Sequence, residues 1–344
     1  MNSKLVKRLR LATLSFLALS GAFSSSLYAT PAGNPATPVL PGINPEQQGW
    51  GALELCRSYD LFAALAGSLK VGFCGDYIFS ESSRVSDVPV ITSVTTLSGS
   101  GPATQVISTE KTMDFDLTNS RTNVSCVFAS ISLQDISSVF IPLLDVSFEV
   151  KIGGLKDYCR LPVNAYRDFT SSPLATESQA TNGLIEMQTN YGFVWDLCLR
   201  KILWKDGVSF IGASASYRHA ACPIDYVVIH NQANPEVFFA DSNGKMSHKE
   251  WGAHLGMTTY VNDYILPYIG VGVGNTTRMA PADCFNRLES EFTNLKFKVR
   301  KINSYRRVMF CCGATSCPSN NFFYTVEGRW GCQRAVHVAG GFHF

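Results

Sequence analysis

The chain has 344 residues, of which 46% are hydrophobic and only 16% are charged, a more apolar composition than that of most soluble proteins. Its 22 Phe and 13 Tyr residues exclude an intrinsically disordered chain. The formal net charge of +2 falls to about −2 once four basic residues of the N-terminal segment are set aside, which argues against a basic nucleic-acid-binding protein.

Residues 1–29 have the pattern of a secretory signal peptide. The segment begins with four cations and no acid: Lys4, Lys7, Arg8 and Arg10. The apolar stretch ATLSFLALSGAF follows, and cleavage is predicted between Ala29 and Thr30. The alternative is an N-terminal membrane anchor, which the short apolar run disfavours because a spanning helix needs about 20 residues.

Residues 30–344 are predicted to form one domain, since neither an internal repeat nor a linker divides them. Residues 30–65 are predicted to be an extended leader and first turn, because Pro, Gly and Asn are frequent at the start of this segment. No uninterrupted apolar run of about 18 residues follows residue 29, so no transmembrane helix is predicted. Two classes remain: a soluble exported protein and a transmembrane β-barrel.

Five segments alternate between apolar and polar residues, which predicts β-strands with one apolar and one wet face. They are residues 68–79, 112–119, 146–154, 183–200 and 295–301. In the longest segment, one apolar face is predicted to hold Ile185, Met187, Tyr191, Phe193, Trp195, Leu197 and Leu199. Strands of soluble sandwiches cluster near about five or six residues, whereas a membrane-spanning strand needs about 9–11.

These lengths favour an all-β fold, a transmembrane antiparallel β-barrel. At roughly 20 residues for each strand and its connection, the mature chain has room for about 16 strands. Barrels of this kind have an even strand count, which places both ends of the chain on the same side of the membrane.

The last eleven residues, RAVHVAGGFHF, alternate up to the terminal Phe. They predict a strand that pairs with the first strand and closes the barrel, because a closed sheet leaves no edge in the membrane. The lipid face is predicted to hold Val336, Val338, Phe342 and Phe344, and the lumen face Ala335, His337, Ala339, Gly341 and His343. The alternative is the edge strand of a soluble domain, which the signal segment and the other strands disfavour.

A barrel of that size would enclose a water-filled lumen, whose selectivity depends on the charges that point inward. The strongest candidates are Lys296, Lys298 and Arg300, three cations on one strand face and about 7 Å apart. Further pore-lining candidates are Lys151, Arg200 and Arg329. Acids on the same parity predict a lumen of mixed charge: Asp114, Asp116, Glu149, Glu186, Asp196 and Glu327. The alternative for the three-cation ladder is a solvated face with no solute preference.

All eleven cysteines follow residue 29, and an exported chain with this many is predicted to form disulfides. The candidates are Cys56, Cys74, Cys126, Cys159, Cys198, Cys222, Cys284, Cys311, Cys312, Cys317 and Cys332. Because eleven is odd, one thiol stays free or bonds to a neighbouring protein if all the others pair within the chain. A zinc site is disfavoured, since no C-x-x-C pair occurs. The adjacent Cys311 and Cys312 are expected to have different partners, because a bond between them would be strained.

No catalytic site and no cofactor are predicted. The six histidines are scattered, and neither H-E-x-x-H nor G-x-S-x-G occurs. A barrel hydrolase with a Ser–His pair assembled in space is the alternative. The stretch GVGVGN, from Gly270 to Asn275, lacks the helix that follows a nucleotide-binding loop, and it therefore predicts small residues in a strand.

Three stretches resemble the chlamydial outer-membrane porins, the family of the major outer membrane protein: TPAGNPATP, LKVGFCGDYIF, and RAVHV followed by FHF. Within that family the chain looks most like the smaller second porin. The resemblance implies an outer-membrane protein that lets small hydrophilic solutes diffuse passively. It also implies that small dicarboxylates such as 2-oxoglutarate are the favoured solutes.

Two other functions stay open: a disulfide cross-linked structural protein of the outer membrane, and a surface antigen or adhesin with little pore activity. The expected partners are outer-membrane lipid, small anionic solutes, disulfide-linked envelope proteins and further copies of the chain in a homo-oligomer such as a trimer. Nucleic acid is not expected as a partner.

Overall fold

The structure, a computed structural model, describes residues 69–97, 105–132, 146–168, 178–206, 209–230, 235–238, 244–261, 265–280, 301–319 and 322–343. Within these ranges no helix is long and apolar enough to cross a bilayer. The predicted signal segment, the leader, Cys56, Cys284, the ladder of Lys296, Lys298 and Arg300, and Phe344 lie outside the described residues.

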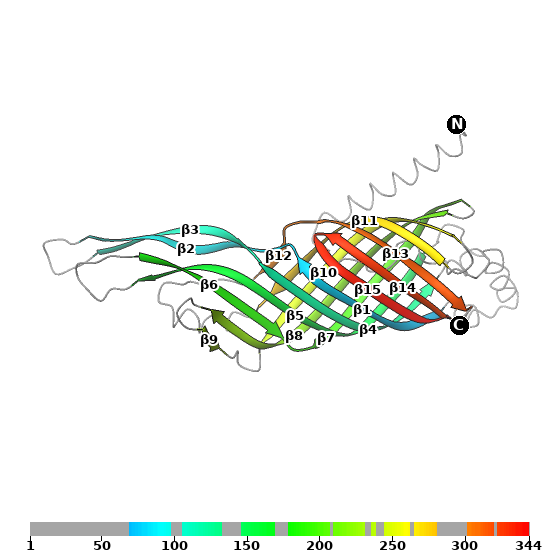
Figure 1. The fold of residues 1–344 in the computed structure, drawn as a ribbon, viewed down its shortest axis with the longest axis horizontal. Helices are drawn as coiled ribbons and strands as arrows, with labels where there is room; N and C mark the ends of the chain where they lie inside the picture. Colours follow the sequence, from blue (N-terminus) through cyan, green and yellow to red (C-terminus); the bar gives the residue numbers. More distant parts are fainter. Residues whose placement is uncertain are drawn as a thin grey trace, which may run out of the picture.

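The described elements are β-strands, all joined in antiparallel pairs in one sheet (Figure 1). In chain order they are β1 Leu69–Glu81, β2 Ser83–Leu97, β3 Gln105–Asp116, β4 Asn119–Ser132, β5 Val146–Asp168, β6 Ser178–Thr189, β7 Gly192–Asp206, β8 Ser209–His230, β9 Pro235–Phe238, β10 Lys245–Thr259, β11 Ile265–Met279, β12 Ile302–Ser304, β13 Val308–Ser319, β14 Phe322–Gly331 and β15 Gln333–His343.

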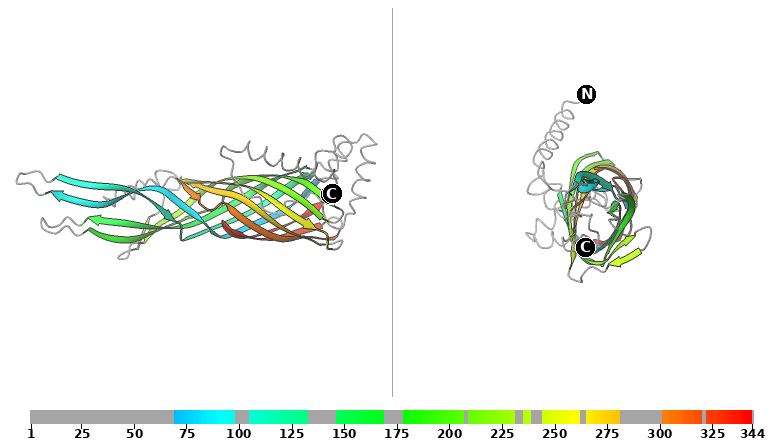
Figure 2. Two further views of the ribbon diagram at one scale, coloured as in Figure 1. Left: turned by 90° about the horizontal axis from the view of Figure 1, so that it is seen from above. Right: turned by 90° about the vertical axis from the view of Figure 1, so that its left-hand side faces the viewer.

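Ten strands close into a barrel, in the ring order β1–β4–β5–β7–β8–β10–β11–β13–β14–β15 and back to β1. The last strand pairs with the first, with Lys70 opposite His343 and Tyr77 opposite Val336. The end-on view in Figure 2 shows this ring, and its side view shows the hairpins β2–β3 and β5–β6 reaching far beyond one rim. The β-class and the even strand count are therefore confirmed.

The predicted count of about 16 strands is wrong. The barrel has fewer strands than predicted because several strands are long: β5 has 23 residues and β8 has 22. A membrane crossing needs only about 9–11 residues in a strand. The excess strand length forms two hairpins outside the barrel. In one of them β6 pairs with the second half of β5, and in the other β3 pairs with β2.

Alternate residues of the barrel strands point to opposite faces of the wall. On β1, Phe73 is 74% exposed on the outside while Asp76 is 4% exposed on the inside. On β15, Val336, Val338 and Phe342 are exposed, whereas His337 is buried. The prediction of one continuous apolar face over residues 183–200 is wrong, because β6 buries its odd-numbered residues and β7 buries its even-numbered residues.

The change of parity occurs at two residues that belong to neither strand, Asn190 and Tyr191. Before them Ile185 and Met187 are buried, and after them Phe193 is exposed. An interruption of this kind moves every following side chain to the other face of a sheet, because the side-chain period is two residues.

Glycines of β11 give room to a large side chain inside the barrel. A Cβ atom at Gly272 would lie 1.6 Å from Cδ2 of His254, on the neighbouring strand β10. The stretch predicted as small residues in a strand is thus part of β11, and at Gly272 the absence of a side chain makes room for the imidazole. The tight turn from β14 to β15 has a separate requirement, because Gly331 has a φ of 118°.

Gly272→Ala is expected to lower the free energy of unfolding by about 1–3 kcal/mol, because the His254 ring must leave its position. Gly328→Ala is the matched control, since nothing lies within 4 Å of a Cβ atom at that position. Urea unfolding of the refolded barrel in detergent micelles measures both. Equal unfolding midpoints for the two variants would contradict the close packing at Gly272.

Candidate functional site

The barrel interior holds a high density of buried charge. Six cations and seven carboxylates of the described residues are at most 8% exposed. The cations are Lys70, Lys151, Arg200, Arg218, Arg278 and Arg329, and the acids are Asp76, Glu81, Glu149, Asp157, Asp196, Glu250 and Glu327. A buried charge is costly unless it is paired and hydrogen-bonded, so the pairing decides what this interior can do.

The first cluster surrounds the carboxylate of Asp76 on β1. Arg218 Nη2 lies 2.7 Å from its Oδ2, while Arg329 Nη2 and His337 Nδ1 both contact its Oδ1, the latter at 3.1 Å. Arg218 is on β8, four strands away from β1 around a ring of ten, so this ion pair crosses the lumen.

Arg218 also binds two other carboxylates. Its Nη1 lies 2.7 Å from Glu250 Oε2 on β10, and its Nη2 lies 3.1 Å from Asp196 Oδ2 on β7. One guanidinium therefore ties three strands to β1. Gln333 links two further members, since Arg329 Nη1 donates to its Oε1 at 3.5 Å and its Nε2 donates to Glu250 Oε1 at 2.9 Å. We call the residues around Asp76 the central cluster.

A second cluster surrounds Asp157 on β5. Arg278 Nε on β11 lies 2.5 Å from its Oδ2, and His248 Nδ1 on β10 lies 3.1 Å from the same atom. Thr122 donates to the other oxygen at 2.9 Å. Arg278 also reaches Glu81 Oε2 on β1 at 2.6 Å, so its guanidinium bridges the two sides of the lumen.

A third cluster runs along the wall rather than across it. Arg200 contacts both oxygens of Glu149, at 3.0 and 3.1 Å, and Lys151 lies 3.1 Å from the same carboxylate. Glu149 and Lys151 are on β5 and Arg200 is on the adjacent β7. Lys151 and Arg200, both pore-lining candidates, thus face inward and share one acid.

Some buried polar atoms of the interior have no hydrogen-bond partner among the described residues. They include both ring nitrogens of His254, Oγ of Ser214, Oδ1 of Asp196 and Nε of Arg218. Buried polar groups in proteins are paired with protein atoms or with ordered water. The interior at this level is therefore suited to water, in contrast to an apolar core.

An apolar constriction lies nearer the barrel end at which β1 starts. Phe128 of β4 and Phe323 of β14 are buried with Cys317, and the two ring centroids are 6.1 Å apart. The strands β4 and β14 are three apart around the barrel, so the contact between these two Phe side chains also crosses the lumen. Ten strands enclose little more space than the eight that side chains can fill, and the interior here is filled.

The other predicted charged residues divide between the two faces. Arg329, Glu149, Asp196 and Glu327 point inward, whereas Asp114, Asp116 and Glu186 do not, which corrects their predicted place in the lumen. Those three acids lie beyond the apolar wall, where the extended strands meet water on the outside, and they pair with Arg84 and Arg160.

Sequence reasoning missed most of the residues that cross the lumen: Arg218, Arg278, Asp157, Glu250 and His248. One signal was present, since Ser214, Ser216 and Arg218 share a parity between small apolar residues on β8. Parity shows which face a residue occupies, but not which residue it meets across the barrel.

The nine described cysteines carry free thiols in the structure, so disulfide formation stays a prediction. Cys74 of β1 and Cys126 of β4 stand directly opposite each other in the ladder, and their thiols are in hydrogen-bond contact. Cys311 is buried and Cys312 is exposed, so these neighbours point to opposite faces of the wall.

Mild oxidation of the folded barrel with diamide is expected to join Cys74 to Cys126 before any other described pair, because no strand needs to move. Two thiols then lose their hydrogens to diamide, which becomes the hydrazine. Mass spectrometry of peptides from the non-reduced protein identifies the bond. A first bond between any other two described cysteines would contradict this register.

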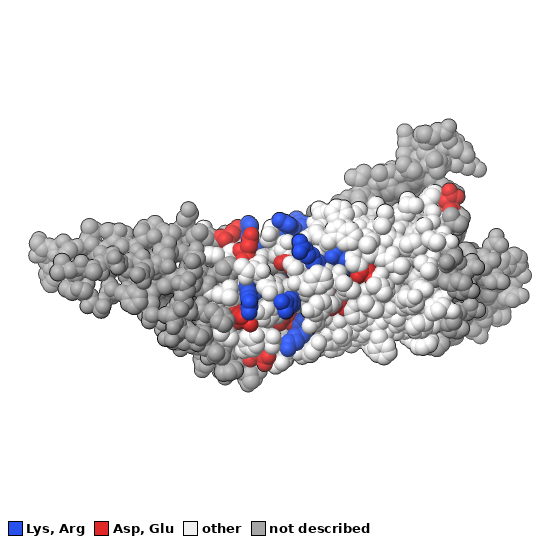
Figure 3. Space-filling view, in the orientation of Figure 1, with Lys and Arg blue, Asp and Glu red and all other residues white. Residues whose placement is uncertain are grey.

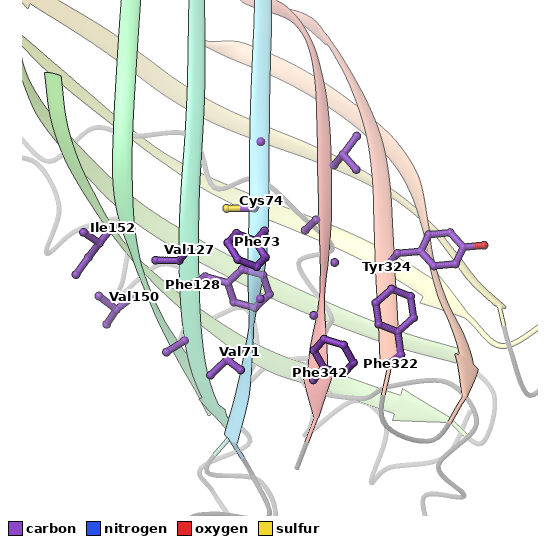
Figure 4. Close-up of a pocket in the computed structure, with 17 residues that line it drawn as sticks. Val71, Phe73, Cys74, Val127, Phe128, Val150, Ile152, Phe322, Tyr324 and Phe342 are labelled. Carbon is purple, nitrogen blue, oxygen red and sulfur yellow. The ribbon is translucent and has the colours of Figure 1, made fainter. Parts of the chain in front are cut away.

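The outer wall is apolar over a broad band, which Figure 3 shows as white surface. A cavity of about 890 Å³ opens on this outer wall across β5, β4, β1, β15 and β14, not in the lumen. Figure 4 shows its lining, in which Phe73, Phe322 and Phe342 surround a floor of small residues. Within the described residues, no group of three or more His, Cys, Asp or Glu could hold a metal ion.

Comparison with known proteins gives consistent matches. A family model described as Chlamydia major outer membrane protein matches residues 6–238. Proteins named Outer membrane protein B (PorB) from Chlamydia pneumoniae and from Chlamydia trachomatis serovar D are each 61% identical to this chain over the full length of both proteins. The Major outer membrane porin, serovar L3, of Chlamydia trachomatis is 22% identical over 98% of this chain and 100% of that protein.

The family model covers more than half of the chain, and the two relatives at 61% identity cover all of it. These matches agree with a barrel that has an apolar outer wall and a charged interior. The chain therefore belongs to the Chlamydia major outer membrane protein family and is a protein of the bacterial outer membrane.

Proposed function

We propose that the chain is a porin, a narrow barrel through which small hydrophilic solutes diffuse passively, with a preference for small dicarboxylates. The observation that carries the proposal is the pair of sites at which Arg and His side chains hold a carboxylate inside the barrel, at Asp76 and at Asp157. Distant relatives named Major outer membrane porin support the transport class.

The barrel end with Lys70 and His343 is assigned to the periplasmic side. Two connections at this end are short, since residues 207–208 separate β7 from β8 and residues 320–321 separate β13 from β14. At the other end, 22 residues separate β11 from β12, and the hairpins extend far beyond the rim. Outer-membrane barrels have short periplasmic turns and long extracellular loops.

Water supports passage through the filled interior. Polar atoms such as those of His254 and Ser214 have no described partner, and charged side chains of this length can exchange one partner for water or for a solute. The ion pairs that cross the lumen join strands only through side chains, so their separation needs no change in the β-ladder.

The preference for carboxylates follows from the donors that surround Asp76 and Asp157. Two guanidiniums and an imidazole surround Asp76, and one of each surrounds Asp157. Arginine and protonated histidine form their strongest hydrogen bonds with carboxylates. A solute carboxylate competes with each aspartate for the same donors, and a solute with two carboxylates can engage one site before it leaves the other.

The balance of six cations against seven acids does not by itself favour anions, so selectivity depends on these local sites. The Lys296, Lys298 and Arg300 ladder lies in the sequence between β11 and β12. It remains a proposed second site that draws anions toward the barrel.

The filled interior favours a second candidate function, a structural barrel with little conductance. Its supporting observation is the contact of Phe128 with Phe323 together with the crossing ion pairs. In this alternative the cysteines, Cys312 on the outer surface among them, link the barrel to envelope proteins or to further copies of itself.

Liposome swelling separates the two candidates. The mature chain, residues 30–344, is refolded into liposomes, and swelling is recorded in a sugar, a neutral amino acid and a dicarboxylate of similar mass. Fast swelling in the dicarboxylate is the expected result. Equal rates in all three would mean a porin without the proposed preference. No swelling, with β-structure confirmed by circular dichroism, would support the structural barrel instead.

A further inference from the structure

Cations on the outer surface form a band at the rim of the apolar wall that lies opposite to the start of β1 and the end of β15. Figure 3 shows Lys and Arg gathered where the white wall ends. Six outward-facing cations of the described strands and connections define what we call the basic ring: Arg121, Lys156, Lys249, Arg306, Arg307 and Arg334.

The ring extends around most of the barrel. Arg334 is on β15, Arg121 on β4, Lys156 on β5 and Lys249 on β10, while Arg306 and Arg307 join β12 to β13. Going around the barrel, the widest gap between members is the pair β7 and β8, and elsewhere at most one strand without a member separates two that have one. A charge band that nearly encircles the barrel is unlike a local protein-docking patch.

The members of the basic ring have no acidic partner among the described residues. None of the six forms an ion pair with another described residue, and five of them are exposed while Lys156 is half-buried. The acids of the same zone are already engaged, since Asp114 and Asp116 pair with Arg84, and Glu186 pairs with Arg160. The ring therefore offers six positive charges to an external partner.

Aromatic side chains lie next to the basic ring. The guanidinium carbon Cζ of Arg306 lies 5.7 Å from the centroid of the Tyr305 side chain, and that of Arg121 lies 6.0 Å from the centroid of the Tyr158 side chain. On the membrane side of the basic ring, Tyr77 and Trp330 are about half exposed. Tyrosine and tryptophan at this depth mark the boundary between the apolar core of a membrane and its headgroups.

The order along the outer wall is thus apolar side chains, then aromatic side chains, then unpaired cations. This order matches a lipid leaflet, in which acyl chains lie below and phosphate groups lie above. We propose that the basic ring binds the phosphate groups of anionic lipid headgroups in the membrane leaflet at this rim of the barrel.

The physical reason for lipid rather than free phosphate is the apolar wall. A lipid phosphate is held at the depth of the ring by acyl chains packed on residues such as Phe73, so the ring meets it at high local concentration. Free phosphate in water has no such anchor, and exposed cations attract it only weakly at physiological salt.

The test compares the refolded full-length mature chain with two variants. The first replaces all six ring residues by Gln, namely R121Q, K156Q, K249Q, R306Q, R307Q and R334Q. The second, the control, replaces Arg84 and Arg160 by Gln, which are partly exposed cations already paired with acids. Native mass spectrometry from detergent micelles counts retained phosphatidylglycerol and retained phosphatidylcholine.

We expect the unchanged protein and the control to retain phosphatidylglycerol in preference to phosphatidylcholine, and the six-residue variant to lose at least about tenfold of that preference. The preference should also fall as sodium chloride is raised, because the contacts are exposed. Equal retention of both lipids by the unchanged protein would overturn the proposal, as would an unchanged preference in the six-residue variant.

A second measurement distinguishes lipid from free anion. Inorganic phosphate, added at constant ionic strength, should not displace phosphatidylglycerol, and displacement would mean a general anion site rather than a lipid site. The thermal unfolding midpoint of each variant in neutral detergent shows whether the barrel is intact. None of these readouts depends on solute passage, so the result is independent of the proposed porin function.

Discussion

Arg218→Gln is expected to lower the free energy of unfolding by about 3–5 kcal/mol, the largest loss of any single substitution on the outer or inner face of the barrel. The guanidinium of Arg218 contacts the carboxylates of Asp76, Asp196 and Glu250. Glutamine has no positive charge, so three acids would face one another in a buried interior and repel. Urea unfolding in micelles, followed by circular dichroism and by heat-dependent gel migration, measures the loss.

Two further variants sharpen this expectation. Arg334→Gln removes an arginine that is exposed and pairs with no acid in the described part of the chain, and its effect should stay within about 0.5 kcal/mol. Adding Asp196→Asn and Glu250→Gln to Arg218→Gln removes two of the three acids and should restore part of the lost stability. A single variant as stable as the unchanged protein would show that the crossing ion pairs do not hold the barrel together.

Asp76→Asn is expected to raise the permeability ratio of anions over cations. The substitution removes the carboxylate that occupies Arg218, Arg329 and His337, and it leaves those donors to a solute. A unit charge at about 6 Å changes the energy of a monovalent ion by about 0.7 kcal/mol even in water, which corresponds to about a threefold change in the ratio. Reversal potentials across planar bilayers in a salt gradient measure it.

The comparison with other charges tells where selectivity is set. Arg329→Gln should move the ratio toward cations, since it leaves Asp76 with one partner fewer. Replacing Lys296, Lys298 and Arg300 with Gln should also lower the anion preference if the ladder draws anions toward the barrel. A ratio unchanged in Asp76→Asn but lowered by the ladder variant would place the selective step outside the lumen.

The clusters around Asp76 and Asp157 also explain why the barrel interior is expected to tolerate few substitutions. Asp76 and Asp157 are each bound by side chains from at least two other strands, so each substitution affects several strands at once. On the outer wall each side chain faces lipid, so a substitution of one apolar residue by another, such as Val336→Leu, should change the free energy of unfolding little. Mutational tolerance is therefore expected to alternate along each strand with the period of two.

The sequence alone was enough to determine the class of fold, the alternation of faces and the family. Alternation is a local property, since two neighbouring residues on a strand must point to opposite sides, and it can be read wherever the strand is regular. It placed Phe73 outside and Lys151 inside correctly. It failed at Asn190 and Tyr191, because an interruption of the ladder leaves no mark in the composition of the segment.

The strand count and the charged network were decided only by the tertiary structure. The number of strands depends on how far each strand extends past the membrane, and no local rule limits the 23 residues of β5. The contact of Arg218 with Asp76 joins residues 142 positions apart, on strands that face each other across a narrow barrel. Such a pair depends on the closure of the ring, which brings opposite walls within reach of one side chain, and sequence spacing contains no measure of that distance.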